Sequence, residues 1–132
     1  MWIDPKTLAP VAAALEKSGY QQFASPGDRH GSWEWSFCRV SGGLTRFVIL
    51  AATPAAHGDK LEMELWIGAE ADQRFTRRRV ESLKVRADAL PAIAEDLSVR
   101  AERAASKANL LSRPDLIEDY PGDVRPRARA TA

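Results

Sequence analysis

The chain of 132 residues has a single cysteine, Cys38, and no long apolar run. One cysteine cannot form an intramolecular disulfide, so the sequence lacks the covalent framework that stabilises small secreted domains. No basic segment leads into an apolar stretch at the amino terminus, and no run reaches the roughly 18 residues of a membrane-spanning helix. These absences predict a cytoplasmic protein, and the content of alanine and arginine suggests a bacterial source.

Net charge and ligand-binding motifs are also scarce. The formal charge of +1 gives no global attraction to nucleic acid or to anionic lipid. Neither of the glycine patterns that cradle phosphates, GxxxxGK[ST] and GxGxxG, occurs. His30 and His57 lack neighbours at zinc-site spacing, apart from the pair of His57 with Asp59. We therefore expect no cofactor and no bound metal.

The first residues carry helix-start signals. Asp4 can cap an early amide, Pro5 suits the first helical position, and Gly19 can end the helix in the left-handed conformation. Pro10 opposes a helix that begins this early, so the helix alternatively begins at Thr7 with Pro10 in its first turn. The apolar positions at helical spacing are Leu8, Val11, Ala12 and Leu15.

A loop over residues 25–31, rich in proline and glycine, is followed by three strand patterns between Ser32 and Gly68. The first strand alternates with its aromatic residues on one face, and residues 41–43 offer a tight hairpin turn. Residues 47–52 are apolar on both faces, which is typical of a central strand covered on both sides. Residues 61–67 alternate cleanly, so that Glu62, Glu64 and Trp66 face outward.

Residues 74–88 fit both a strand and a helical seam, and we favour a fourth strand. A long helix capped by Asp88 then runs to about Leu111, with Pro91 in its first turn. The prediction is an α+β protein with one domain over residues 1–120. It has an antiparallel sheet of three to four strands with both helices packed on it, in the order α-β-β-β-β-α. Residues 115–120 form a last turn, and residues 121–132 form a flexible basic tail.

Two residue groups could in principle support catalysis. Cys38 and a histidine could meet in the fold as a nucleophile and its base, and Glu62 with Glu64 could act as paired carboxylates. A lone cysteine in a strand is usually a packing residue, however, and alternating glutamates are what any solvated sheet face displays. We expect no catalytic site.

The charge changes sign abruptly between the third and fourth strand patterns. Residues 59–72 are mainly acidic, and residues 74–86 are mainly basic. If these strands pair, the charges form cross-strand ion pairs that need no partner. Trp66 fits this explanation poorly, because a large ring among exposed carboxylates is typical of an interface anchor; the alternative is that a helix or the tail covers it. The predicted partner-binding residues are Glu62, Glu64, Trp66, Arg77, Arg78 and Arg79.

The element order resembles that of several groups of small immunity proteins and inhibitors that neutralise toxins. This resemblance implies a non-catalytic binding protein whose partner is another protein, such as a toxin or an effector. The alternative is a nucleic-acid-binding accessory protein, in which the run Arg77 to Arg79 and the basic tail contact phosphates.

Overall fold

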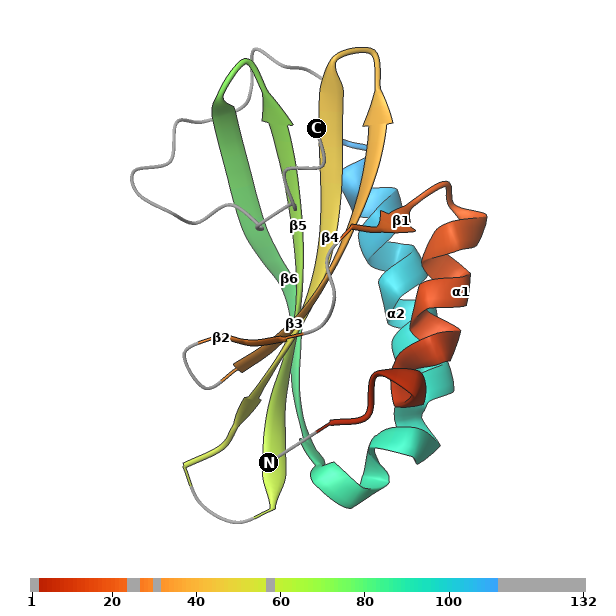
Figure 1. Cartoon of the computed structure of the whole chain (residues 1–132), viewed down its shortest axis with the longest axis vertical. Helices are drawn as coiled ribbons and strands as arrows, with labels where there is room; N and C mark the ends of the chain where they lie inside the picture. Colours follow the sequence, from red (N-terminus) through yellow and green to blue (C-terminus); the bar gives the residue numbers. More distant parts are fainter. Residues whose placement is uncertain (1–2, 24–26, 30–31, 57–58, 112–132) are drawn as a thin grey trace.

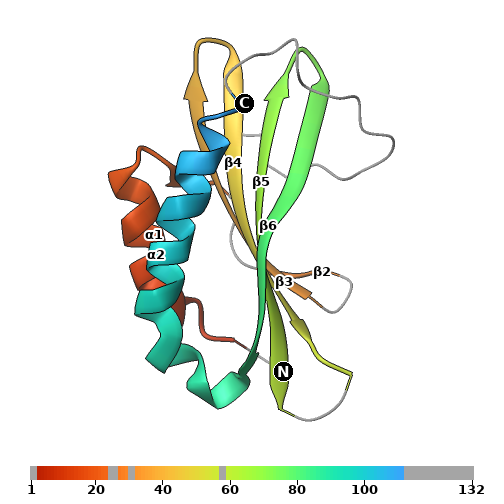
Figure 2. The same ribbon diagram turned by 180° about the vertical axis from the view of Figure 1, so that it is seen from behind.

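The computed structural model describes residues 3–23, 27–29, 32–56 and 59–111. It has two layers: an antiparallel sheet, and two α-helices that lie side by side on one face of that sheet (Figures 1 and 2). In chain order the elements are the 3-10 turn η1 (Pro5–Leu8), α1 (Ala9–Lys17), β1 (Gln21–Gln22), β2 (Gly27–Arg29), β3 (Ser32–Ser41), β4 (Leu44–Pro54), β5 (Lys60–Ala71), β6 (Arg74–Arg86), the 3-10 turn η2 (Ala87–Ala89) and α2 (Leu90–Ala108). None of the described helices is long and apolar enough to cross a membrane.

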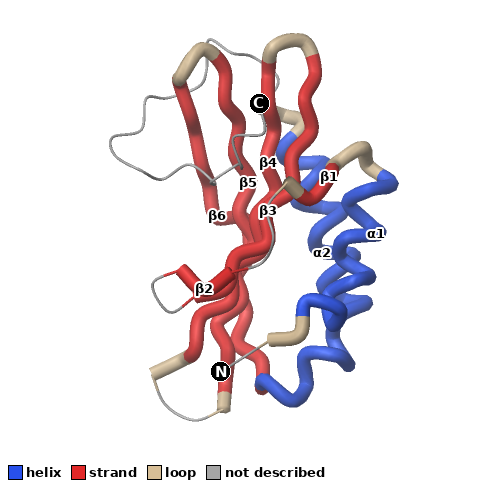
Figure 3. The backbone as a smooth tube through the Cα atoms, in the orientation of Figure 1, coloured by secondary structure: helices blue, strands red, loops and turns tan. Residues whose placement is uncertain are grey.

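The α+β class and the antiparallel sheet are confirmed, whereas the expected number of strands is too low. The four long strands match the four strand patterns, and they pair in sequence order from β3 to β6 (Figure 3). Two short strands were not predicted: β1 pairs with one part of β3 and β2 with another. β2 lies within residues 25–31, which we expected to be a loop. These residues form a strand because their backbone pairs with the edge of β3.

The first α-helix begins later than both predicted starts, at Asp4 and at Thr7, although Pro10 lies in its first turn as the second of these predicted. Asp4 accepts a hydrogen bond from the Lys6 amide at 3.0 Å and so caps the 3-10 turn η1. The α-helix itself begins at Ala9, with Pro10 in its first turn, where a missing N–H costs nothing. After α1, Gly19 adopts a φ of +86°, as expected of a left-handed cap.

The central strand β4 is buried on both faces, as its sequence predicted. On the helix side, Val48 and Leu50 belong to a core that also contains Trp35 of β3, Leu65 of β5 and Leu97 of α2. On the opposite side, which we call the outer face, Phe47 and Ile49 form a second buried cluster with Phe75 of β6. The hairpin from β3 to β4 turns at Gly42 and Gly43, which both have positive φ angles.

The second helix ends at Ala108, before the expected end near Leu111, and it lacks the expected cap. It runs from Leu90 to Ala108 with Pro91 in its first turn. No side chain caps its N-terminus, because Asp88 lies within the 3-10 turn η2 and accepts from the Arg86 guanidinium at 3.1 and 3.2 Å. The predicted last turn over residues 115–120 and the tail over residues 121–132 lie outside the described residues.

Candidate functional site

Residues 74–86 form the strand that the sequence favoured, and its pairing with β5 creates the candidate site. Where the start of β5 pairs with the end of β6, Glu62 lies opposite Lys84 and Glu64 lies opposite Ser82. A β-bulge between Leu65 and Trp66 then shifts the register by one residue. Beyond the bulge, Trp66 lies opposite Arg79. Because paired residues share a face, acidic and basic side chains meet on the outer face.

Two cross-strand ion pairs join the predicted acidic and basic residues. Arg79 Nη1 lies 2.7 Å from Glu64 Oε2, and Lys84 Nζ lies 3.6 Å from Glu62 Oε1. The Arg79 and Lys84 side chains remain 55% and 65% exposed, so water and salt screen both pairs. Exposed pairs of this kind contribute about 0.2–1 kcal/mol. They order the charged side chains more than they stabilise the fold.

Trp66 lies on the outer face as predicted, but its indole is only partly exposed. The Arg77 guanidinium carbon lies 4.4 Å from the centroid of the ring, and Trp66 also packs against the outer-face cluster that contains Ile49 and Phe75. Ile49 on β4 is the cross-strand partner of Trp66, so the register places an apolar side chain beside the indole. Trp66 is therefore half-buried, and its role as an interface anchor stays a prediction.

Arg77 joins the outer faces of three strands. Its Nη2 lies 3.5 Å from Glu34 Oε1 on β3, while its guanidinium covers Trp66 on β5. Only 18% of the Arg77 side chain and 20% of the Glu34 side chain are exposed. Partial burial strengthens both the ion pair and the cation–π contact relative to fully solvated ones. Arg77 therefore covers one part of the Trp66 indole.

The three consecutive arginines do not form one patch. Arg78 is paired with Ile67, whose side chain belongs to the helix-side core, so Arg78 projects on the helix side of β6 and is exposed. Arg77 and Arg79 project on the outer face. The sequence brings the arginines together along the chain, whereas the strand separates them between two faces.

The two edges of the sheet differ in how they are covered. At one edge, β1 and β2 pair with different parts of β3. At the other edge lies β6, which pairs with β5 along its whole length, and no other strand in the described part of the chain lies beside it (Figure 1). A strand of 13 residues with basic side chains on both faces therefore ends the sheet. Sequence reasoning missed this edge, because a strand pattern does not reveal its position in the sheet.

The described residues give the catalytic alternatives no support. They contain no group of three or more histidine, cysteine or acidic side chains that could hold a metal ion. Cys38 is half-buried beside the outer-face cluster, and this burial raises the pKa of its thiol, which disfavours the nucleophilic thiolate. His30 and His57, the proposed bases, lie outside the described residues.

Similarity to known proteins does not supply a function for this site. Comparisons with protein-family models, with curated proteins and with solved structures find no match to the chain.

Proposed function

We propose that the chain is a non-catalytic protein that binds another protein at β6 and on the adjoining outer face. The observation that supports this proposal is the contrast between the two sheet edges: short strands pair with β3 at residues 32–34 and 37–38, whereas no described strand pairs with the outer edge of β6. An edge strand offers a row of backbone N–H and C=O groups to which an extended segment can add. Backbone hydrogen bonds then supply affinity, and the side chains on both faces supply specificity.

The charges on β6 favour an acidic segment as the added strand. Arg78 on the helix side and Arg79 on the outer face flank the edge, and both are exposed. Carboxylates at successive positions of an added strand point to opposite faces of the sheet, so they can meet both arginines. In this arrangement Glu62 and Glu64 do not contact the partner directly. They position Lys84 and Arg79.

Addition of a second copy of β6 is disfavoured by the same charges. A second copy would bring another strand with six basic residues and one acidic residue, Glu81, to this edge, and like charges close to each other destabilise strand pairing. Charged edge strands are a common protection against self-association. The edge is therefore selective for a partner of opposite charge.

The finer hypothesis is an inhibitor of the immunity type, in which the acidic segment belongs to a toxin or an effector. Nucleic-acid binding is the alternative hypothesis for the same arginines. Engagement of Arg77 by Glu34 and of Arg79 by Glu64 weighs against it, because carboxylates beside arginines reduce the charge available to phosphates. The two hypotheses predict different responses to nuclease treatment.

The test is affinity capture with the tagged full-length chain and matched charge reversals. Arg78→Glu reverses the edge charge without breaking a described ion pair, and Arg103→Glu reverses an exposed charge on α2 as the control. We expect one protein to be retained by the wild type and by Arg103→Glu, and to be lost at least fivefold in Arg78→Glu. Bound partner should also slow hydrogen exchange of β6 amides.

Two results would contradict the proposal. If the same proteins are captured equally by Arg78→Glu and by the wild type, β6 is not the binding edge. If nuclease treatment abolishes capture, and labelled RNA or DNA binds the wild type with a steep dependence on salt, the nucleic-acid alternative replaces it.

A further inference from the structure

The bulge in β6 divides this edge strand into two parts. It leaves Val80 without a cross-strand partner on β5, because the flanking Arg79 and Glu81 lie opposite consecutive residues of that strand. Val80 packs against the helix-side core, and Glu81 Oε1 lies 3.1 Å from Arg100 Nη1 on α2. Two successive side chains therefore lie on the helix side, and the alternation of β6 is shifted by one residue beyond the bulge.

The part beyond the bulge, residues 82–86, has one apolar face and one basic face. Leu83 and Val85 pack against the helix-side core. Lys84 and Arg86 alternate with them, so their side chains lie on the outer face. Before the bulge, in contrast, arginines lie on both faces of β6. The two parts of the edge therefore offer different chemistry to an added strand.

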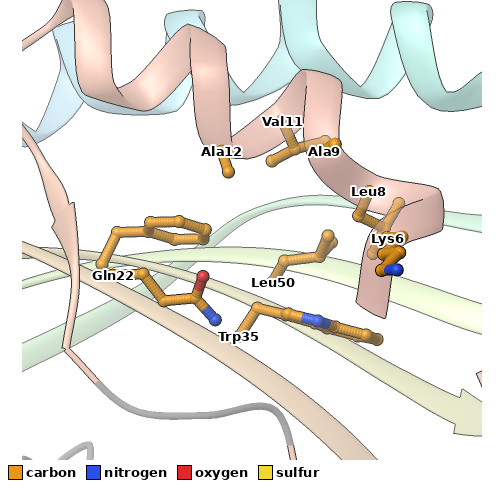
Figure 4. Close-up of a pocket in the computed structure, with 9 residues that line it drawn as sticks. Lys6, Leu8, Ala9, Val11, Ala12, Gln22, Trp35 and Leu50 are labelled. Carbon is orange, nitrogen blue, oxygen red and sulfur yellow. The ribbon is translucent and has the colours of Figure 1, made fainter. Parts of the chain in front are cut away.

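The helices cover the apolar face of the sheet unevenly. Over β3 and β4, Val11 of α1 points toward Leu50 and Trp35 (Figure 4), and these two strand residues are 1% and 3% exposed. The second helix, α2, packs chiefly over β4 and β5 and contacts β6 less. Leu83 and Val85 are accordingly only half-buried. Part of their apolar surface is left for a side chain that approaches from beyond the edge.

The two cations of the basic face already have carboxylate neighbours, but these pairs are exposed. Lys84 Nζ lies 3.6 Å from Glu62 Oε1, and Arg86 Nε lies 3.1 Å from Asp88 Oδ1. The Lys84 and Arg86 side chains are 65% and 64% exposed, so water screens both pairs. An ammonium has three N–H donors and a guanidinium has five, so each cation can accept a second carboxylate.

An added strand would contact both faces of residues 82–86 at once. Residues opposite each other on neighbouring strands share a face, so a partner residue opposite Leu83 or Val85 lies on the apolar side. A partner residue opposite Lys84 or Arg86 lies on the basic side. We propose that residues 82–86 bind an extended segment of a partner protein in which apolar residues alternate with aspartate or glutamate. This inference rests on the proposed binding at β6 and specifies the sequence pattern of the bound segment.

The probe is a synthetic heptapeptide with the one-letter sequence SEVEVES, blocked at both ends and titrated into the full-length ¹⁵N-labelled chain. The peptide SEEEVVS has the same composition without the alternation, and SKVKVKS has the alternation with the opposite charge. SEVEVES should shift the backbone amide resonances of residues 82–86 and slow their hydrogen exchange. It should bind about threefold more tightly than SEEEVVS and about fivefold more tightly than SKVKVKS.

Variants of the chain test each face separately. Lys84→Gln removes a cation from the basic face and should weaken SEVEVES about two- to fivefold. Val85→Thr places a hydroxyl on the apolar face at nearly constant volume and should weaken SEVEVES about two- to fourfold. Leu83→Gln supplies the same test if Val85→Thr does not fold. Lys107→Gln, at an exposed position in the last turn of α2, is the matched control and should leave binding unchanged.

The alternating pattern is refuted if millimolar SEVEVES leaves the amides of residues 82–86 unmoved, or if SEVEVES and SEEEVVS bind equally. It is also refuted if Lys107→Gln weakens binding as much as Lys84→Gln. Protein capture with Arg78→Glu decides the proposed function separately. Capture that depends on Arg78, with no difference between the peptides, removes only the alternating pattern. A difference between the peptides, with equal capture by Arg78→Glu and the wild type, contradicts the proposed function instead.

Discussion

Replacement of Gly68 by alanine tests how closely β5 and β6 pack beneath the candidate surface. Gly68 lies opposite Arg77 on β6 and opposite Phe47 on β4. A Cβ atom at this position would lie 2.8 Å from the Thr76 carbonyl oxygen and 3.3 Å from the Phe75 ring. The ring could rotate slightly, but the carbonyl belongs to the backbone of β6 and can move only with the strand. Gly68→Ala should therefore displace β6 or leave an overpacked contact.

The magnitude follows from known costs of overpacking. Added methyl groups in packed interiors destabilise proteins by about 1–3 kcal/mol. For a chain of this length, each kcal/mol lowers the melting temperature by about 3–5 °C, so Gly68→Ala should melt about 3–15 °C below the wild type. Urea denaturation followed by circular dichroism gives the free energy of unfolding, and a calorimetric scan gives the melting temperature.

A matched glycine supplies the control for this experiment. Gly42 has a φ of +59° and nothing within 4 Å of an added Cβ atom, so only its backbone angle constrains it. Asparagine tolerates such angles in hairpin turns, and Gly42→Asn should keep the free energy of unfolding within about 0.5 kcal/mol of the wild type. The packing argument is refuted if Gly68→Ala is as stable as Gly42→Asn.

Three further predictions concern stability. Trp66→Ala should lower the free energy of unfolding by about 1–3 kcal/mol, because the ring packs partly against the outer-face cluster. Fully buried aromatic residues typically lose about 3–5 kcal/mol on replacement by alanine. A change below about 0.5 kcal/mol would show that the ring contributes little to packing and would favour an exposed anchor. A double-mutant cycle between Glu64 and Arg79 should give a coupling free energy of about 0.2–1 kcal/mol. This coupling should be smaller in 1 M salt, because salt screens exposed charges. A coupling free energy that does not change with salt would contradict an exposed ion pair. Burial raises the pKa of Cys38 above its ordinary value of 9.0 and that of Tyr20 above 10.0. The folded state therefore holds these two protons more tightly than the unfolded state does. The free energy of unfolding should be highest below about pH 9 and should fall as the pH rises further. Urea denaturation between pH 7 and pH 11 measures this fall, and Cys38→Ala should remove the part that begins near pH 9.

The strands β4 and β5 were predictable because each has at least one buried face along most of its length, whereas β6 has only two buried residues and its sequence also fitted a helix. Alternation over residues 61–67 and apolar continuity over residues 47–52 report such burial directly. The short strands β1 and β2 have two and three residues, too few for any periodicity to appear. They exist because the edge of β3 offers backbone partners, and this is a property of the assembled sheet.

The candidate site was predictable in its charges and not in its exposure. Opposite charge on consecutive strands correctly indicated cross-strand pairs such as Arg79 with Glu64. The cover on Trp66 depends on the bulge, on Ile49 across the sheet and on how Arg77 reaches toward Glu34.

The pairing of α1 with α2 has a consequence for how the chain folds during synthesis. The two helices contact each other along the same face of the sheet, although all the strands lie between them in sequence. A ribosome must therefore release α2 before α1 can pack against it, and until then the apolar inner face of the nascent sheet lacks part of its cover. Completion of the last helix is the event that closes the fold, and truncation within it should leave a product that chaperones and proteases recognise.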